Sequence, residues 1–140
     1  MRAATGHDDV SRLWLFSECT AAELRKIRRL LEEVTVPAGT LLVQEGEPGY
    51  LFFVVVSGTA SVLRGRRTTG TLGPGDFFGE LSLIDKGPRS ASVTCETEMT
   101  MLVIRQRDFQ TILRSSPRIT RKLLASMSRR LRDTNALAYA

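Results

Sequence analysis

The sequence predicts a mainly β fold, a barrel or jelly roll with helices at both ends. Between residues 34 and 105, short β-rich runs are separated by Gly-bearing turns at intervals of about ten residues, a spacing typical of barrels and jelly rolls. Helix-start patterns lie before and after this region. A chain of 140 residues fits one domain and can bury one sound core.

The N-terminal part is expected to begin with a disordered polar tail over residues 1–12, followed by a helical part over residues 13–33. Thr20 and Glu23 have the spacing of a capping box, in which each side chain bonds the other residue's backbone N–H. Apolar residues then recur on one side of the predicted helix, at Leu24, Ile27, Leu30 and Leu31. The helix is expected to end near Val34, where β-branched residues and Pro37 take over.

The β-barrel is expected over residues 34–105. Segment 51–56 is continuously apolar, which predicts a strand covered on both faces, whereas segments 59–63 and 90–93 alternate in polarity. The expected strands are 40–44, 50–57, 59–64, 67–72, 90–95 and 99–104.

Helices are expected again over residues 107–138. Asp108 can cap a short helix that starts at Phe109, and Ser116 with Pro117 forms a cap and first helical residue for a longer one. Within the longer helix the spacing of three and four residues predicts the seam of a two-stranded coiled coil, and therefore a weak homodimer. The seam residues are Leu124, Met127, Leu131, Thr134 and Ala138.

Composition excludes several classes of protein. The N-terminus lacks the apolar stretch of a signal peptide and no apolar run reaches the roughly 20 residues of a membrane span, so a cytoplasmic protein is expected. Cys19 and Cys95 lack CxxC spacing and are expected to be free thiols. With His7 as the only histidine, no His-rich metal site and no Ser-His-Asp arrangement can be assembled, so neither a metal site nor an enzyme is expected.

Positive charge is concentrated at the C-terminal end. The net charge is +5, and residues 114–140 contain seven basic residues against one acidic residue. This distribution would suit an acidic partner or nucleic acid, but a solvated helical face in an Arg-rich protein is the favoured interpretation.

Glu80 and Arg89 form the most informative pair, nine positions apart around a turn that begins at Gly79. Gly79 permits close approach of the backbone to a ligand, and free N–H groups at such a turn attract an anion. The Arg89 guanidinium can donate two hydrogen bonds to a phosphate, while an ionised Glu80 can accept from a ribose hydroxyl. The alternative is that Glu80 and Arg89 simply pair with each other on a loop.

The segments 77–81 and 88–91, followed by a strand, resemble the phosphate-binding cassette of the cyclic nucleotide-binding domain family. Upstream turns at 36–39, 45–49, 57–58 and 72–76 follow the same family's order, and the resemblance covers about residues 13–135. It implies an eight-stranded β-jelly-roll barrel with an N-terminal helix and a C-terminal helical lid. It also implies a ligand site in which Glu80 binds the ribose 2′-hydroxyl, Arg89 binds the cyclised phosphate, and the N–H groups of Gly79 and Leu81 complete the contacts.

Segment 128–135 resembles the long helix of the bacterial catabolite-activator branch, which forms a homodimer seam and presents a Thr and its successor to the adenine. The resemblance assigns base contacts to Thr134 and Asn135, although that branch has Ser at the second position. Cyclic AMP (cAMP) is therefore expected in preference to cyclic GMP, while Ser90 could serve the phosphate or reach a guanine amino group. Regulators of this branch continue with a winged helix-turn-helix, which the six residues after Thr134 cannot supply, so direct DNA binding is not expected.

The resemblance thus implies a regulatory module in which the nucleotide repositions the C-terminal helix. One alternative is the sensor half of a DNA-binding regulator, truncated before its helix-turn-helix. Others are a module that regulates an enzyme, and a degenerate scaffold that binds no nucleotide. The sequence does not identify the effector protein.

Overall fold

The structure is a computed structural model that describes the backbone of residues 7–134 and the side chains of residues 10–133. Within these limits the chain forms eight strands, five α-helices and one 3-10 helix (η1). In chain order they are α1 His7–Arg12, η1 Trp14–Phe16, α2 Ala21–Arg28, β1 Glu32–Val36, β2 Leu41–Val43, β3 Leu51–Ser57, β4 Ala60–Arg64, β5 Arg67–Leu72, β6 Phe77–Phe78, α3 Glu80–Asp85, β7 Ser92–Cys95, β8 Met99–Arg105, α4 Gln106–Ser115 and α5 Pro117–Thr134.

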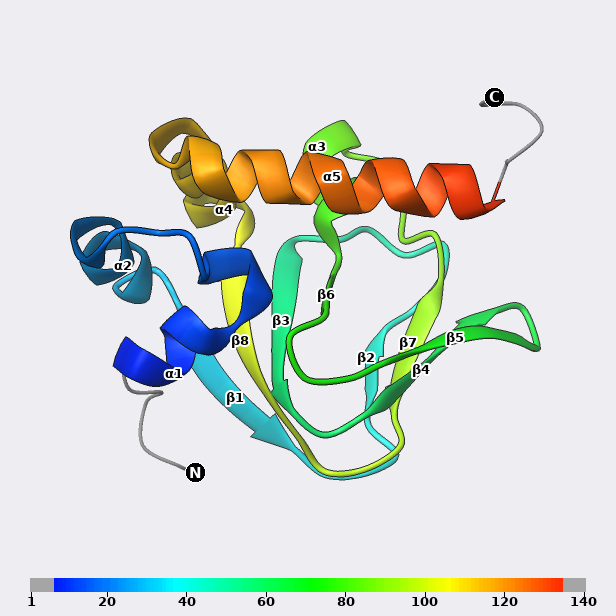
Figure 1. The fold of residues 1–140 in the computed structure, drawn as a ribbon. Helices are drawn as coiled ribbons and strands as arrows, with labels where there is room; N and C mark the ends of the chain where they lie inside the picture. Colours follow the sequence, from blue (N-terminus) through cyan, green and yellow to red (C-terminus); the bar gives the residue numbers. More distant parts are fainter. Residues whose placement is uncertain (1–6, 135–140) are drawn as a thin grey trace.

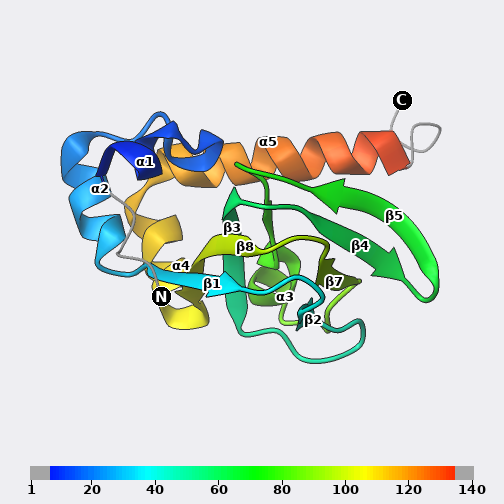
Figure 2. The ribbon, with the colours of Figure 1, turned by 90° about the horizontal axis from the view of Figure 1, so that it is seen from below.

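The strands form two antiparallel four-stranded sheets, with the orders β1-β8-β3-β6 and β2-β7-β4-β5. Helices gather at one end of the barrel and α5 runs across its top, while the β4–β5 hairpin projects from the opposite side (Figures 1 and 2). The predicted mainly β jelly roll of eight strands, with an N-terminal helix and a long C-terminal helix, is confirmed.

Strand β3 is buried on both faces, as the continuously apolar sequence predicts. Phe52 and Val54 lie in a core between the first sheet and the helices, whereas Phe53 and Val55 lie in a second core between the two sheets. Because successive side chains of a strand point to opposite faces, one apolar run supplies both cores.

The N-terminal region differs from expectation in two places. Residues 7–12, expected to belong to a disordered tail, form α1, because Val10 is buried in the helix-facing core. The capping box of α2 is present, but α2 ends at Arg28 and β1 already begins at Glu32, before the expected barrel start at residue 34. Residues 1–6 lie outside the described part of the chain.

The C-terminal helices follow the predicted pattern with one change. α4 begins at Gln106, so Asp108 lies in its first turn and is not the cap; Arg105 takes that position without a side-chain cap bond. Ser116 Oγ accepts a hydrogen bond from the Ile119 N–H at 3.5 Å, and Pro117 is the first residue of α5. No helix in the described residues is long and apolar enough to cross a membrane.

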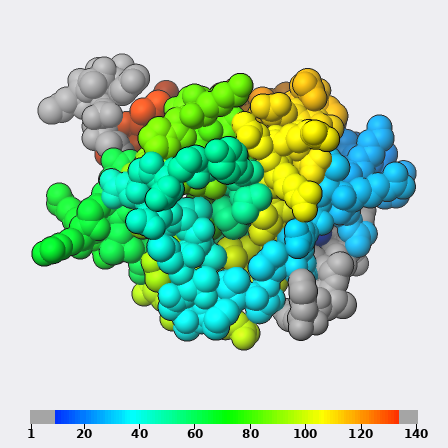
Figure 3. All heavy atoms as spheres, turned by 180° about the vertical axis from the view of Figure 1, so that it is seen from behind, coloured from blue at the N-terminus to red at the C-terminus, as the bar shows by residue number. Residues whose placement is uncertain are grey.

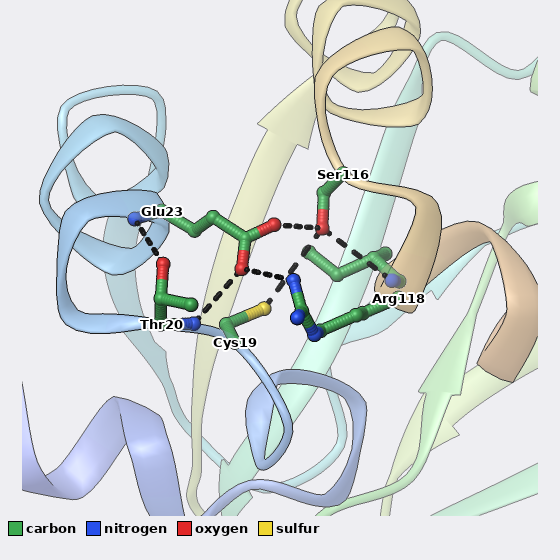
Figure 4. Close-up of polar contacts among 6 residues, drawn as sticks. Cys19, Thr20, Glu23, Ser116 and Arg118 are labelled. Carbon is green, nitrogen blue, oxygen red and sulfur yellow. Dashed lines mark hydrogen bonds and ion pairs between the residues drawn. The ribbon is translucent and has the colours of Figure 1, made fainter.

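Glu23 ties the N-terminal helix to the start of α5 (Figure 4). One carboxylate oxygen accepts from the Thr20 N–H at 2.9 Å and from Arg118 at 3.1 Å, and the other accepts from the Ser116 hydroxyl at 3.1 Å. The Thr20 backbone bond, with further help from Ser116 and Arg118, lowers the pKa of Glu23 below its ordinary value of 4.5. Cys19 lies beside Ser116, and burial raises the pKa of its thiol.

We expect Glu23→Gln to lower the free energy of unfolding by about 1 kcal/mol at pH 7, because the amide lacks the charge that its three donors favour. A carboxyl whose pKa is lowered in the folded state stabilises the protein above its unfolded pKa, and this stabilisation is lost as pH falls. The difference between wild type and variant should therefore shrink below about pH 4.5. Urea unfolding across pH measures it, and a pH-independent difference would contradict the assignment. Glu96→Gln, which changes an exposed carboxylate, is the control.

Candidate functional site

The candidate site is built around Gly79, which connects β6 to α3. β6 pairs with β3 through Phe53 opposite Phe78 and Val54 opposite Phe77, so the turn is fixed against the first sheet. Gly79 has φ of 96°, and a Cβ added to it would lie 2.7 Å from both the Leu51 carbonyl oxygen and Arg89 Nη1. Only glycine fits this backbone and this space.

Glu80 follows at the first position of α3 and is almost completely buried, with 1% of its surface exposed. Its Oε1 atom lies 2.6 Å from Nη1 of Arg130 on α5. The alternative in which Glu80 and Arg89 form an ion pair with each other is wrong within the described residues, where the cation paired with Glu80 is Arg130. A buried carboxylate requires such a partner, because an unpaired charge in a protein interior is costly.

Arg130 was not predicted as a site residue. Its side chain is 48% exposed, donates to the Phe77 carbonyl oxygen at 3.2 Å, and lies with Cζ 5.3 Å from the Phe77 ring centroid. One feature of the sequence could have identified it: Arg130 precedes Thr134 by four positions, and residues four apart share a helix face.

Arg89 is the second buried charged group, with 7% of its surface exposed. Nη1 donates to the Gly79 carbonyl oxygen at 3.2 Å and Nη2 to the Leu51 carbonyl oxygen at 2.8 Å. Burial lowers the pKa of Arg89, while the nearby Glu80 opposes this shift. Because a guanidinium has five N–H groups, Arg89 keeps donors for another acceptor.

Gly49 is a further residue that the sequence did not single out for a role. A Cβ at this position would lie 2.5 Å from Cζ and Nε of Arg89 and 2.7 Å from Cβ of Ser82. The missing side chain therefore leaves the space in which the guanidinium lies.

Of the remaining predicted site residues, two have described side chains and two do not. Leu81 lies in the first turn of α3 and is exposed, and Ser90 is an exposed residue directly after Arg89. Thr134 is the last residue of α5, and its side chain lies outside the described ones. Asn135 lies outside the described residues altogether.

Three of the five residues of the expected seam on α5 have described side chains. Leu124 and Leu131 are exposed and Met127 is half-buried, whereas Ala138 lies outside the described residues. The helix therefore presents two unpaired leucines on its surface within the described residues.

An open hollow of about 420 Å³ lies beside the cassette, where segments 46–50 and 82–88 meet Gln106. Figure 3 shows this region, with the cyan-green turn before β3 beside the green cassette and the yellow α4. Neither Glu80 nor Arg89 lines the hollow, but Gly49 and Ser82 do, so it adjoins the space in which the Arg89 guanidinium lies.

The site offers complementary groups for a small polar anion. Arg89 provides unused N–H donors, the turn at Gly79 provides backbone N–H groups, and Glu80 provides carboxylate lone pairs beyond the one that Arg130 uses. The barrel and this site together have the groups of a ligand-binding domain, and a ligand that carries both a hydroxyl and a phosphate matches them.

The chain belongs to the cyclic nucleotide-binding domain family, whose model matches residues 33–116. A cyclic nucleotide-gated potassium channel of Mesorhizobium japonicum is 43% identical over 110 residues, which are 79% of this chain and 30% of the channel. A CRP-like cAMP-activated global transcriptional regulator of Mycobacterium tuberculosis is 33% identical over 131 residues, which are 90% of this chain and 58% of the regulator.

The crystal structure of the Thermus thermophilus catabolite activator protein has the same fold, with a TM-score of 0.81 at 29% identity. The alignment covers 89% of this chain and 61% of that protein. The chain therefore spans only part of each of these relatives and corresponds to their cyclic nucleotide-binding domain.

We expect Gly79→Ala to be more damaging than Gly75→Ala, a matched control. Both glycines have similar left-handed φ values, 96° and 89°, but nothing lies within 4 Å of a Cβ at Gly75. Gly75→Ala should therefore cost about 1–2 kcal/mol of folding free energy for the backbone conformation alone. Gly79→Ala adds a collision with Leu51 and Arg89, and thermal unfolding should show a larger loss. Equal losses would mean that the turn can relax around a side chain.

Proposed function

We propose that this domain binds cAMP between the Gly79 turn and α5, and that binding repositions α5. The observation that supports this proposal best is the convergence of two buried charged groups, Glu80 and Arg89, at a turn that only glycine can form. Of the two, only Glu80 has an ion-pair partner in the described part of the chain, Arg130, so the buried Arg89 guanidinium is the charge left for a ligand. Arg89 donates only to two backbone carbonyl oxygens within the described residues.

Each group of the site receives a part of the nucleotide. Arg89 donates its remaining N–H groups to the cyclic phosphate, joined by the N–H groups of Gly79 and Leu81 and by the Ser90 hydroxyl. Glu80 accepts a hydrogen bond from the ribose 2′-hydroxyl while Arg130 holds Oε1. A carboxylate has about four lone-pair positions, so it can serve both partners at once.

The proposed preference for cAMP over cyclic GMP draws on two points. The regulator of Mycobacterium tuberculosis is described as cAMP-activated, and it is 33% identical to this chain. We further propose that Thr134 and the following residue, Asn135, contact the base, because the exocyclic amino group of adenine can donate a hydrogen bond to a side-chain oxygen.

Arg130 supplies the physical link between ligand and helix. A nucleotide that contacts Glu80 changes the surroundings of the carboxylate that holds α5 in place. A ligand shifts a conformational equilibrium by the difference between its affinities for the two states. We therefore propose that α5 has at least two positions, of which the nucleotide favours the one with Arg130 on Glu80.

The effect of a movement of α5 on another protein depends on which partner α5 contacts. The exposed Leu124 and Leu131 support a weak homodimer through α5. The relatives include a channel and a transcription regulator, each longer than this chain. The sensor half of a DNA-binding regulator is accordingly a second candidate, favoured by alignment over 90% of this chain.

Isothermal titration of the protein with cAMP and with cyclic GMP tests the proposal. Arg89→Ala should weaken cAMP binding by about 2 kcal/mol, because truncation leaves the buried phosphate without a charged donor. Lys86→Asn is the control: it removes a cation from the same segment, and asparagine tolerates the left-handed backbone found there, with φ of 59°. Equal affinity of wild type and Arg89→Ala would show that the site is misassigned.

Glu80→Gln tests the ribose contact. The amide oxygen can still accept a hydrogen bond, so the variant should lose about 1 kcal/mol of binding free energy, less than Arg89→Ala. With 2′-deoxy-cAMP the difference between wild type and Glu80→Gln should become smaller, because the hydroxyl that the carboxylate accepts from is absent. A full penalty with the deoxy nucleotide, measured by the same titration, would rule out the ribose contact.

A further inference from the structure

Two cationic side chains of α5 each lie over one aromatic ring, and the two rings come from distant parts of the chain. Lys122 Nζ lies 4.7 Å from the ring centroid of Trp14 in η1, and Arg130 Cζ lies 5.3 Å from the ring centroid of Phe77 in β6. The two rings are nearly parallel, with an interplanar angle of 8° and centroids 6.3 Å apart. We call Lys122, Trp14, Phe77 and Arg130 the aromatic ladder.

Both ends of the ladder are fixed by hydrogen bonds. Lys122 is buried, and Nζ donates to the Trp14 carbonyl oxygen and to the Ser17 hydroxyl. Arg130 donates to the Phe77 carbonyl oxygen and to Glu80. Each cation therefore holds both the ring it contacts and the backbone of the residue that carries that ring.

The ladder makes the position of α5 dependent on the two rings. Lys122 and Arg130 are eight positions apart, which is about 12 Å along a helix axis. A shift or rotation of α5 moves both cations relative to the rings, and a cation–ring attraction falls when the cation leaves the ring face. Trp14 is 40% exposed, so its ring is free to move on the solvent side when α5 moves.

We propose that Trp14 and Phe77 are positioning residues for Arg130, and that nucleotide at Glu80 is energetically coupled to the N-terminal segment through the ladder. The proposal rests on the proposed nucleotide site and names a route by which its occupancy reaches η1. The Phe77 ring holds the Arg130 guanidinium in position to donate to Glu80, and the Trp14 ring stacks against the Phe77 ring. Coupling is reciprocal: if nucleotide binding shifts the conformational equilibrium of Trp14, the conformation of Trp14 changes the affinity for nucleotide by the same factor.

The first test uses Trp14 itself, the only tryptophan of the chain. Its emission should change during titration with cAMP, with the midpoint that calorimetry gives for binding. The change should be lost in Arg130→Met at saturating cAMP, because the cation that connects Glu80 to Phe77 is gone. Arg129→Met, which changes the adjacent exposed arginine, should retain it.

The second test is a double-mutant cycle on cAMP affinity, measured by calorimetry. Trp14→Leu should weaken binding roughly two- to fivefold in the wild-type background, the range expected for a cation–ring contact at a partly exposed site. It should have no effect in the Arg130→Met background, where the ladder is already broken. Trp14→Phe, which keeps an aromatic face, should recover most of the affinity.

The outcomes separate the two proposals. Absence of binding heat in the wild type would overturn the nucleotide site, and the coupling with it. Binding heat without a change in Trp14 emission, or equal effects of Trp14→Leu in both backgrounds, would overturn the coupling alone. Circular dichroism and thermal unfolding of each variant show that an affinity change belongs to folded protein. A general loss of stability would lower affinity in both backgrounds and would not reproduce the non-additivity.

Discussion

The buried carboxylate of Glu80 is the constraint on which the arrangement of the site depends. A charge removed from water must be paired, and the paired cation comes from α5 and not from the segment that carries Glu80. The buried carboxylate is thereby attached to the helix that covers the barrel. Arg89, with the opposite charge, instead donates to two backbone carbonyl oxygens. The two charged groups thus have separate partners and can take separate parts of one ligand.

The barrel provides the rigid frame for these contacts. β3 belongs to both cores, and β6 is only two residues long but pairs with it directly before Gly79. The left-handed turn therefore begins from a fixed strand end, and Leu51 of β3 accepts a hydrogen bond from Arg89. A short strand with few partners is sufficient here because its neighbour is buried on both faces.

Much of this arrangement could be predicted from local sequence patterns. The capping box at Thr20 and Glu23, the Ser116–Pro117 start of α5 and the two-sided burial of β3 all follow from short-range spacing. β6 could not be identified, because two residues carry no periodicity. α1 was missed because its order depends on Val10 reaching a core formed by distant residues. The same limit applies to Arg130, whose role depends on a contact across 50 positions, and to Gly49, whose lack of a side chain matters only once Arg89 lies beside it.

The burial of α5 changes along its length. Ile119, Lys122 and Leu123 are buried, whereas most side chains from Leu124 to Asp133 are exposed. The first two turns of α5 are thus clamped by packing in the helical layer. Its exposed far arm is held, within the described residues, by the hydrogen bonds that Arg130 donates to Glu80 and to the Phe77 carbonyl oxygen. Without the contacts of Arg130, this far arm would lose these two hydrogen bonds to the barrel side, while the clamped end would keep its packing.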